Sequence, residues 1–113
     1  MTRDQLEQRR TGIGGSDAPA IIGVSPWRSP LDVYLDKIGE AEEVEESPAM
    51  RWGTALEPLV RQAYADATGE TVRVPGLLTH PTQPWMIGHV DGLTDSGRIL
   101  ECKTARTAEG WGE

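Results

Sequence analysis

Two acidic side chains and a lysine stand close together in the last quarter of this 113-residue chain. Residues 98–103 read RILECK, a pattern that predicts a short buried strand. Side chains alternate faces along a strand, so Glu101 and Lys103 are expected on one face while Leu100 and Cys102 point the other way. A carboxylate and an ammonium group therefore share one side of this strand.

A second acid lies ten residues upstream, where Asp91 ends the apolar run 85–91. If this run and 98–103 pair as a hairpin around residues 95–97, Asp91 joins Glu101 and Lys103 at one place. Carboxylates suit Mg²⁺, which prefers oxygen ligands, and an ammonium group offsets negative charge that develops on a phosphate. This set of side chains is what a magnesium-dependent phosphodiesterase needs.

Two further groups can complete such a site. The main-chain carbonyl of Cys102 lies between the two strand residues, and Glu57 supplies a third acid if the helix that carries it packs across the sheet. A metal-bound water is a strong nucleophile near neutral pH, and Lys103 is placed to orient it or help deprotonate it. Glu57 and Arg61 are four residues apart and can also pair on one helix face.

A structural interpretation of the same residues stays open. Asp91 with Gly92 can be only a turn, Glu57 one more solvated helix acid, and Glu101 with Lys103 an exposed ion pair contributing under about 1 kcal/mol. What favours a site is that Glu101 interrupts an apolar strand, where burying a lone charge is costly. The single cysteine forms no internal disulfide, which fits a reducing compartment and a buried structural thiol.

Residues 9–17, RRTGIGGSD, form a second candidate site. Its glycines allow positive φ angles and close backbone approach. A guanidinium from Arg9 or Arg10, the Ser16 hydroxyl and free amides at a glycine-rich helix start suit a phosphate group. The spacing does not decide between the two arginines, and an ordinary helix cap at Ser16 or Asp17 after a flexible loop is the alternative.

The remaining sequence predicts an α+β fold, with helices first and a meander of antiparallel strands after them. Ser-Pro pairs at 29–30 and 47–48 are helix-start signals, and glycines at 39 and 69 are stop signals. The expected helices span residues 3–10, 18–22, 30–38 and 48–68, the last with a possible kink at Gly53 or Pro58. The expected strands span 71–79, 85–91 and 98–103, with another helix from Thr104. Length indicates a single domain over 1–113.

Charge and hydropathy leave the partner open. The net charge is −7, but six of the 18 acidic residues lie within residues 36–46, so much of the excess belongs to one loop. Charge therefore neither supports nor excludes a nucleic-acid partner. No apolar run approaches the roughly 20 residues of a membrane-spanning helix, and the charged start does not look like a signal peptide. We expect a cytoplasmic protein without a membrane partner.

Five blocks of sequence resemble one known family, and they occur in its order along nearly the whole chain. The blocks are RRTGIGGSD at 9–17, GVSPW at 23–27 followed by Pro30, MRWGTALEP at 50–58, HVDGL at 89–93 and LECKT at 100–104. Together they resemble the N-terminal half of YqaJ-type viral recombinases, which are related to phage lambda exonuclease within the PD-(D/E)xK nuclease superfamily. Val90 stands where that superfamily's proline is usual.

The resemblance implies a restriction-endonuclease-like core and Mg²⁺ or Mn²⁺ held by Asp91 and Glu101, with contributions from Glu57 and the Cys102 carbonyl. Lys103 would be the lysine of the motif. It also implies digestion of duplex DNA from a 5′ end to leave 3′ single-stranded tails, with the terminal 5′-phosphate near Ser16 and Arg9 or Arg10. The partners implied are double-stranded DNA ends and a single-strand annealing protein, and similar enzymes form homotrimers in a phage-infected or prophage-bearing cell.

Similar proteins continue beyond the lysine with a further helix and more strands. The sequence therefore predicts a C-terminally truncated nuclease domain whose sheet is incomplete. Two other functions remain open: a structure-specific or restriction-like endonuclease with the same site, and a catalytically inactive DNA-binding or interaction fragment.

Overall fold

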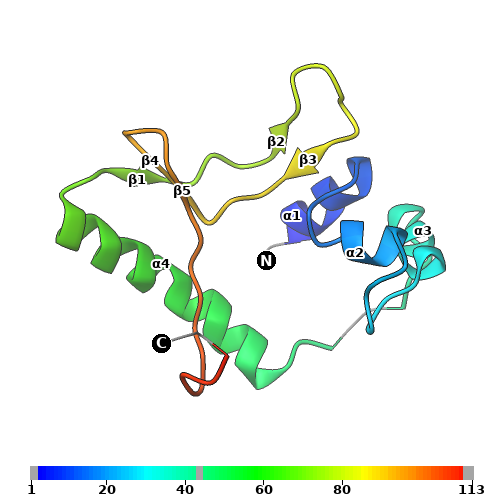
Figure 1. The fold of residues 1–113 in the computed structure, drawn as a ribbon, viewed down its shortest axis with the longest axis horizontal. Helices are drawn as coiled ribbons and strands as arrows, with labels where there is room; N and C mark the ends of the chain where they lie inside the picture. Colours follow the sequence, from blue (N-terminus) through cyan, green and yellow to red (C-terminus); the bar gives the residue numbers. More distant parts are fainter. Residues whose placement is uncertain (1–2, 43–44, 111–113) are drawn as a thin grey trace. The chain divides into compact units, whose positions relative to one another are not determined.

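The computed structural model describes residues 3–42 and 45–110 (Figure 1). It divides into two compact units, and each unit is built from two separate chain segments. The first unit combines Met1–Glu45 with Pro75–His89, and the second combines Glu46–Val74 with Val90–Glu113. Compact units of this kind can belong to one domain, so the single domain over 1–113 stays a prediction.

Short helices form the regular structure in the first segment of the first unit. They are α1 (Arg3–Gln8), the 3₁₀ turn η1 (Arg9–Thr11), α2 (Ala18–Ile21) and α3 (Pro30–Lys37). The predicted start of α3 is confirmed, because the Ser29 hydroxyl accepts a hydrogen bond from the Asp32 amide and the Asp32 carboxylate accepts one from the Ser29 amide. The chain then leaves α3 through Gly39, which has a φ of +79°.

The first unit also holds a two-stranded antiparallel sheet of β2 (Leu78–Thr79) and β3 (Ile87–Gly88). The loop of residues 12–15, called the glycine loop below, contacts the segment before β3. The amide of Ile13 donates a hydrogen bond to the Trp85 carbonyl at 2.6 Å. A Cβ at Gly12 would lie 2.5 Å from that same carbonyl oxygen, so this glycine is required for close approach. The positive φ angles that glycine allows are not used in this loop, because Gly12, Gly14 and Gly15 do not have them.

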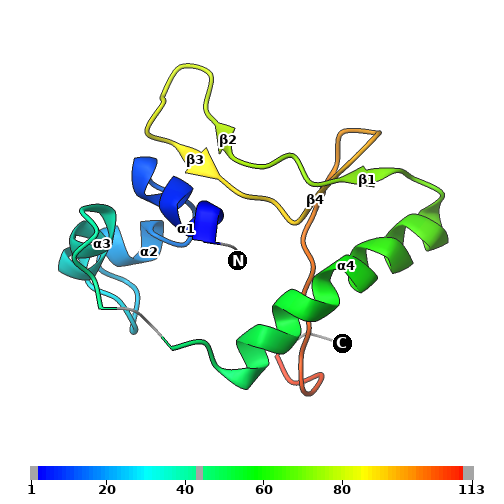
Figure 2. The same ribbon diagram turned by 180° about the vertical axis from the view of Figure 1, so that it is seen from behind.

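The second unit is organised around α4 (Pro48–Thr68), the longest helix. Its first turn is capped by the Ser47 hydroxyl, which accepts from the Met50 amide at 3.2 Å, and it ends at Gly69 with a φ of +73°. The predicted boundaries are confirmed, and Pro58 lies inside one continuous helix (Figure 2).

A three-stranded antiparallel sheet follows α4, in the order β1 (Val72–Arg73), β4 (Gly92–Thr94) and β5 (Ile99–Leu100). The hairpin turn at 95–97 is confirmed, with Gly97 at a φ of +84°. The predicted partner strand is wrong: β5 pairs with 92–94, whereas the run 85–91 contributes β3 to the other sheet. Gly92 makes this register possible, since a Cβ there would lie 2.7 Å from a methyl of Val72 on β1.

The ends of the predicted strands also differ from the structure. Residues 71–79 do not form one strand, because Pro75 and Gly76, which has a φ of +77°, separate β1 from β2. The stretch after β5 runs back along α4, and no helix begins at Thr104 within the described residues to 110. Among the helices of the described segments, none is long and apolar enough to cross a membrane.

Candidate nuclease site and phosphate site

The second unit contains an open cavity of about 330 Å³ that brings together all four predicted catalytic residues. Its lining is contributed by α4, by the residue before β4 and by the stretch after β5. The lining residues are Met50, Gly53, Thr54, Glu57, Asp91, Glu101, Cys102, Lys103 and Thr104. Residues far apart in the sequence therefore meet in one place, although the strand pairing that does this differs from the predicted one.

Asp91 is fixed by a main-chain contact. Its Oδ2 accepts a hydrogen bond of 2.8 Å from the amide of Cys102. Asp91 precedes β4 and Cys102 follows β5, so this bond extends the pairing of the two strands beyond their last ladder position, Gly92 with Leu100. The other oxygen of the carboxylate is left for a further ligand.

Glu57 approaches from α4 with a cation at its side. Its Oε1 lies 2.7 Å from Nη1 of Arg61, one helical turn further on, which confirms the pairing expected from their spacing. The same Arg61 nitrogen donates to the main-chain carbonyl of Asp91 at 3.3 Å. Arg61 thus ties the helix acid to the Asp91 backbone, a link that helical spacing alone does not predict.

Glu101 and Lys103 form an ion pair of 2.9 Å at the cavity rim, with side chains 57% and 60% exposed. The expected burial of Glu101 is wrong, because β5 ends at Leu100 and the following residues leave the sheet. The hydrogen bond to Glu101, together with its charge, raises the pKa of Lys103 above the ordinary 10.5. Lys103 is therefore a cation at neutral pH, and its role toward a phosphate or a water stays a prediction.

The pKa of the Cys102 thiol is affected by the three acids that line the cavity. Burial raises the pKa of Cys102 above the ordinary 9.0, and the charges of Asp91, Glu57 and Glu101 raise it further, against the opposing charge of Arg61. A neutral thiol is a poor nucleophile, which agrees with a structural cysteine. Three carboxylates and one guanidinium thus lie close enough to the end of β5 to act on this thiol.

Hard carboxylate oxygens fit Mg²⁺ or Mn²⁺, which need only one or two carboxylates when waters complete the shell. Asp91 and Glu101 satisfy that requirement in chemical type, and both line the cavity. Within residues 3–42 and 45–110, however, no three Asp, Glu, His or Cys side chains are arranged as a ready ligand cluster. Glu57 and Glu101 are instead held by Arg61 and Lys103.

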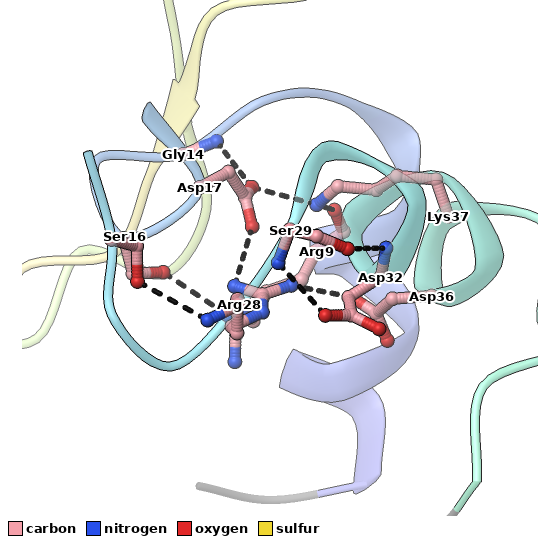
Figure 3. Close-up of polar contacts among 10 residues, drawn as sticks. Arg9, Gly14, Ser16, Asp17, Arg28, Ser29, Asp32, Asp36 and Lys37 are labelled. Carbon is pink, nitrogen blue, oxygen red and sulfur yellow. Dashed lines mark hydrogen bonds and ion pairs between the residues drawn. The ribbon is translucent and has the colours of Figure 1, made fainter. Parts of the chain in front are cut away.

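The first unit contains the second candidate site, and here the structure separates the two arginines. Nη2 of Arg9 donates to the Ser16 hydroxyl at 3.1 Å (Figure 3). The guanidinium of Arg10 instead lies against Gly39, where a Cβ would be 3.8 Å from it. Arg9 is therefore the arginine that contacts Ser16, and which of the two arginines binds a phosphate stays a prediction.

Asp17 has a role that the sequence analysis missed. It makes no side-chain cap on α2, contrary to one expectation, and is instead 1% exposed among three donors. Its Oδ2 accepts from the Gly14 amide at 2.9 Å and lies 2.8 Å from Nζ of Lys37, while Oδ1 lies 3.3 Å from Arg28 (Figure 3). The Gly14 amide is thus occupied, so the expectation of free amides in this loop is wrong for that residue.

The Asp17 carboxylate is charged despite its burial. Desolvation is the largest single influence and acts to raise the pKa, but Lys37, the Gly14 amide and Arg28 together hold it below the ordinary 3.8. The sequence alone does not show which cations approach Asp17. That Lys37 and Arg28 converge on Asp17 depends on how α3 folds back on the glycine loop.

Comparison with known proteins gives these sites a family context. Residues 4–111 match the YqaJ-like viral recombinase domain. The chain belongs to this family. It is similar to the uncharacterized protein YqaJ of Bacillus subtilis strain 168, with 39% identity over 108 residues that cover 92% of this chain and 34% of that protein. The predicted family is therefore confirmed.

Two solved structures show the same arrangement of elements. The alkaline exonuclease LHK-Exo from Laribacter hongkongensis superposes with a TM-score of 0.71 at 26% identity, and its complex with dAMP with a TM-score of 0.70 at 27% identity. Each match covers 88% of this chain and 52% of the exonuclease chain. The predicted α+β nuclease fold is confirmed, and this YqaJ-family chain spans about half of the solved exonuclease.

Proposed function

We propose that this chain carries the active site of a metal-dependent DNA exonuclease that acts in phage or prophage recombination. The observation that carries the proposal is the single cavity lined by Glu57, Asp91, Glu101 and Lys103 in a YqaJ-family chain. The similarity to an alkaline exonuclease supports phosphodiester hydrolysis as the reaction and DNA as the substrate.

In this proposal Asp91 and Glu101 hold Mg²⁺ or Mn²⁺, with Glu57 and the Cys102 carbonyl as further ligands. When bound, the ion supplies Lewis-acid polarisation of the phosphate and a water of lowered pKa. Lys103, which keeps its proton beside Glu101, stabilises the negative charge that builds on the phosphate oxygens. The Asp91 contact with the Cys102 amide holds this acid in place during turnover.

The Arg9 and Ser16 pair is proposed to bind the terminal 5′-phosphate, and Arg10 would contribute only by charge. A guanidinium beside a hydroxyl offers several donors to one phosphate group. Digestion would then start at a 5′ end and leave 3′ single-stranded tails. A single-strand annealing protein, a homotrimeric assembly and a cytoplasmic location complete the proposal.

The proposal is tested with linear duplex DNA carrying 5′-phosphates in Mg²⁺. Glu101→Gln and Lys103→Met are each expected to lower the rate at least about 100-fold, because each removes charge from the reacting centre. Glu109→Gln is the matched control, since it makes the same change at an exposed acid on the same segment. The 5′-phosphate site is tested by Arg9→Ala, which should slow digestion of phosphorylated ends more than of hydroxyl ends.

Two outcomes would replace the proposal with its alternatives. Cutting of closed circular duplex as fast as of linear duplex would indicate an endonuclease. An inactive DNA-binding fragment is favoured by one observation, that Glu57 and Glu101 already have cationic partners. Wild-type protein that binds duplex DNA but neither cleaves it nor gives a heat change on titration with Mg²⁺ would favour that function instead.

A further inference from the structure

Asp17 is the most deeply buried charged side chain among the described residues, yet it lies outside the cavity of the proposed nuclease site. A buried carboxylate is costly unless donors satisfy it, and this one has three from three parts of the chain. A surface position would serve an ordinary turn equally well. The three donors therefore fix Asp17 relative to the loop at Gly14, to Arg28 and to α3.

The contacts of Asp17 connect it to both residues of the Arg9 and Ser16 pair. We call this set of contacts, which also includes Lys37 and Gly14, the circuit. Lys37, 2.8 Å from Asp17, also donates from Nζ to the main-chain carbonyl of Arg9. Ser16 precedes Asp17 in the chain, and its hydroxyl accepts from the Arg9 guanidinium. Asp17 thus acts on both ends of the pair, on the Arg9 backbone through Lys37 and on Ser16 through the turn that it closes with Gly14 (Figure 3).

Charged side chains of both signs surround this circuit. Asp17 is one negative charge between two cations, Lys37 and Arg28, and Arg9 adds a third positive charge beside it. Asp36 lies 3.9 Å from Arg28 and offsets part of this charge. The side chains of Lys37 and Arg28 are 17% and 31% exposed, so both of these cations are largely held within the fold beside Asp17.

We infer that Asp17 is a positioning residue for phosphate recognition: through Lys37 and the Gly14 turn, it holds the Arg9 guanidinium against the Ser16 hydroxyl in a geometry ready for a terminal 5′-phosphate. This inference rests on the proposed function of the Arg9 and Ser16 pair. Asp17 does not touch the phosphate. Its effect is confined to ends that carry one.

Binding is measured by fluorescence anisotropy on duplex DNA labelled at a 3′ end, with either a 5′-phosphate or a 5′-hydroxyl, in EDTA to prevent cleavage. The wild-type protein is expected to prefer the phosphorylated end. Asp17→Asn keeps the size of the side chain and one acceptor but loses the ion pairs. It is expected to reduce the preference about tenfold and to leave hydroxyl-end binding unchanged.

Lys37→Met tests the same circuit from its other end and does not depend on a substitution at the buried acid. It should lose the same preference, and Lys37→Arg should restore part of it because a cation again reaches Asp17. Asp36→Asn is the matched control, since it removes one acidic charge near Arg28 from a half-buried position of α3, and it should keep the preference. In cleavage assays, Asp17→Asn should raise the KM for phosphorylated ends and leave kcat within about twofold.

The outcomes separate this inference from the function on which it rests. Wild-type preference that persists in folded Asp17→Asn and Lys37→Met would overturn the inference and leave the phosphate site intact. Equal loss of binding to both kinds of end would also overturn it, because that result indicates general destabilisation. Failure of the wild-type protein to cleave DNA would instead refute the proposed nuclease activity.

Discussion

Asp91 offers a way to separate the structural and chemical roles of one side chain. Its Oδ2 accepts from the Cys102 amide at 2.8 Å, and both residues are half-buried. Removing an acceptor from a buried donor costs about 1–3 kcal/mol, and partial access of water places the Cys102 amide near the lower end of that range. Asp91→Ala should therefore lower the free energy of unfolding by about 1–2 kcal/mol. Asp91→Asn keeps an oxygen that can accept the same bond and should cost less than about 1 kcal/mol.

The two variants should behave alike toward metal and DNA. Both remove the negative charge that Mg²⁺ requires, so calorimetric titration with Mg²⁺ should lose its signal and cleavage of linear duplex should fall at least about 100-fold. Unfolding is measured by urea titration followed by circular dichroism. Asp95→Ala is the matched control, since it removes an exposed acid from the neighbouring hairpin turn.

Two results would refute this reasoning at different points. Equal destabilisation by Ala and Asn would mean that the hydrogen bond to Cys102 does not hold the end of the hairpin. Magnesium binding that survives in Asp91→Asn would remove Asp91 from the proposed ligands, whatever its effect on stability.

Three further predictions address neighbouring features. Gly92→Ala should destabilise the second unit by about 1–3 kcal/mol in urea titration, because the new methyl would meet Val72 at 2.7 Å, and an unchanged unfolding midpoint would contradict that packing. Cys102→Ala should retain most nuclease activity, and its thiol in the wild type should react slowly with iodoacetamide at neutral pH, because burial and the nearby acids raise its pKa. The pKa of Asp17 is lowered in the folded protein, so its stabilising contribution should be complete above pH 3.8 and should disappear as the pH falls through the folded pKa. Acid titration of unfolding should show this loss in the wild type and a shallower dependence in Asp17→Asn.

The sequence was sufficient to predict the helix ends, because local signals alone determine them. Ser29 and Ser47 cap the helices they were expected to cap, and Gly69 ends α4, because capping depends on residues within one turn of each other. The approach of Glu57, Asp91, Glu101 and Lys103 to one cavity was also predictable, through the order of sequence blocks that resemble the family. Their roles in catalysis stay a prediction.

Features that depend on long-range packing were not predictable in this way. Strand pairing of 92–94 in place of 85–91 depends on Gly92 fitting against β1, which no local pattern reports. The exposure of Glu101 follows from where β5 ends, and the burial of Asp17 from the return of α3 to the glycine loop. In each case the deciding contact joins residues distant in sequence.

The division of each unit into two chain segments affects how the protein can be made. During synthesis, the loop around Ile13 emerges long before Trp85 and Ile87, which supply its main-chain hydrogen-bond partners. Its polar backbone must therefore remain hydrated until the chain has passed His89. The second unit is likewise interrupted, so Glu57 on α4 is synthesised well before Asp91 and Glu101, which line the same cavity. No contiguous fragment of the gene encodes either unit alone.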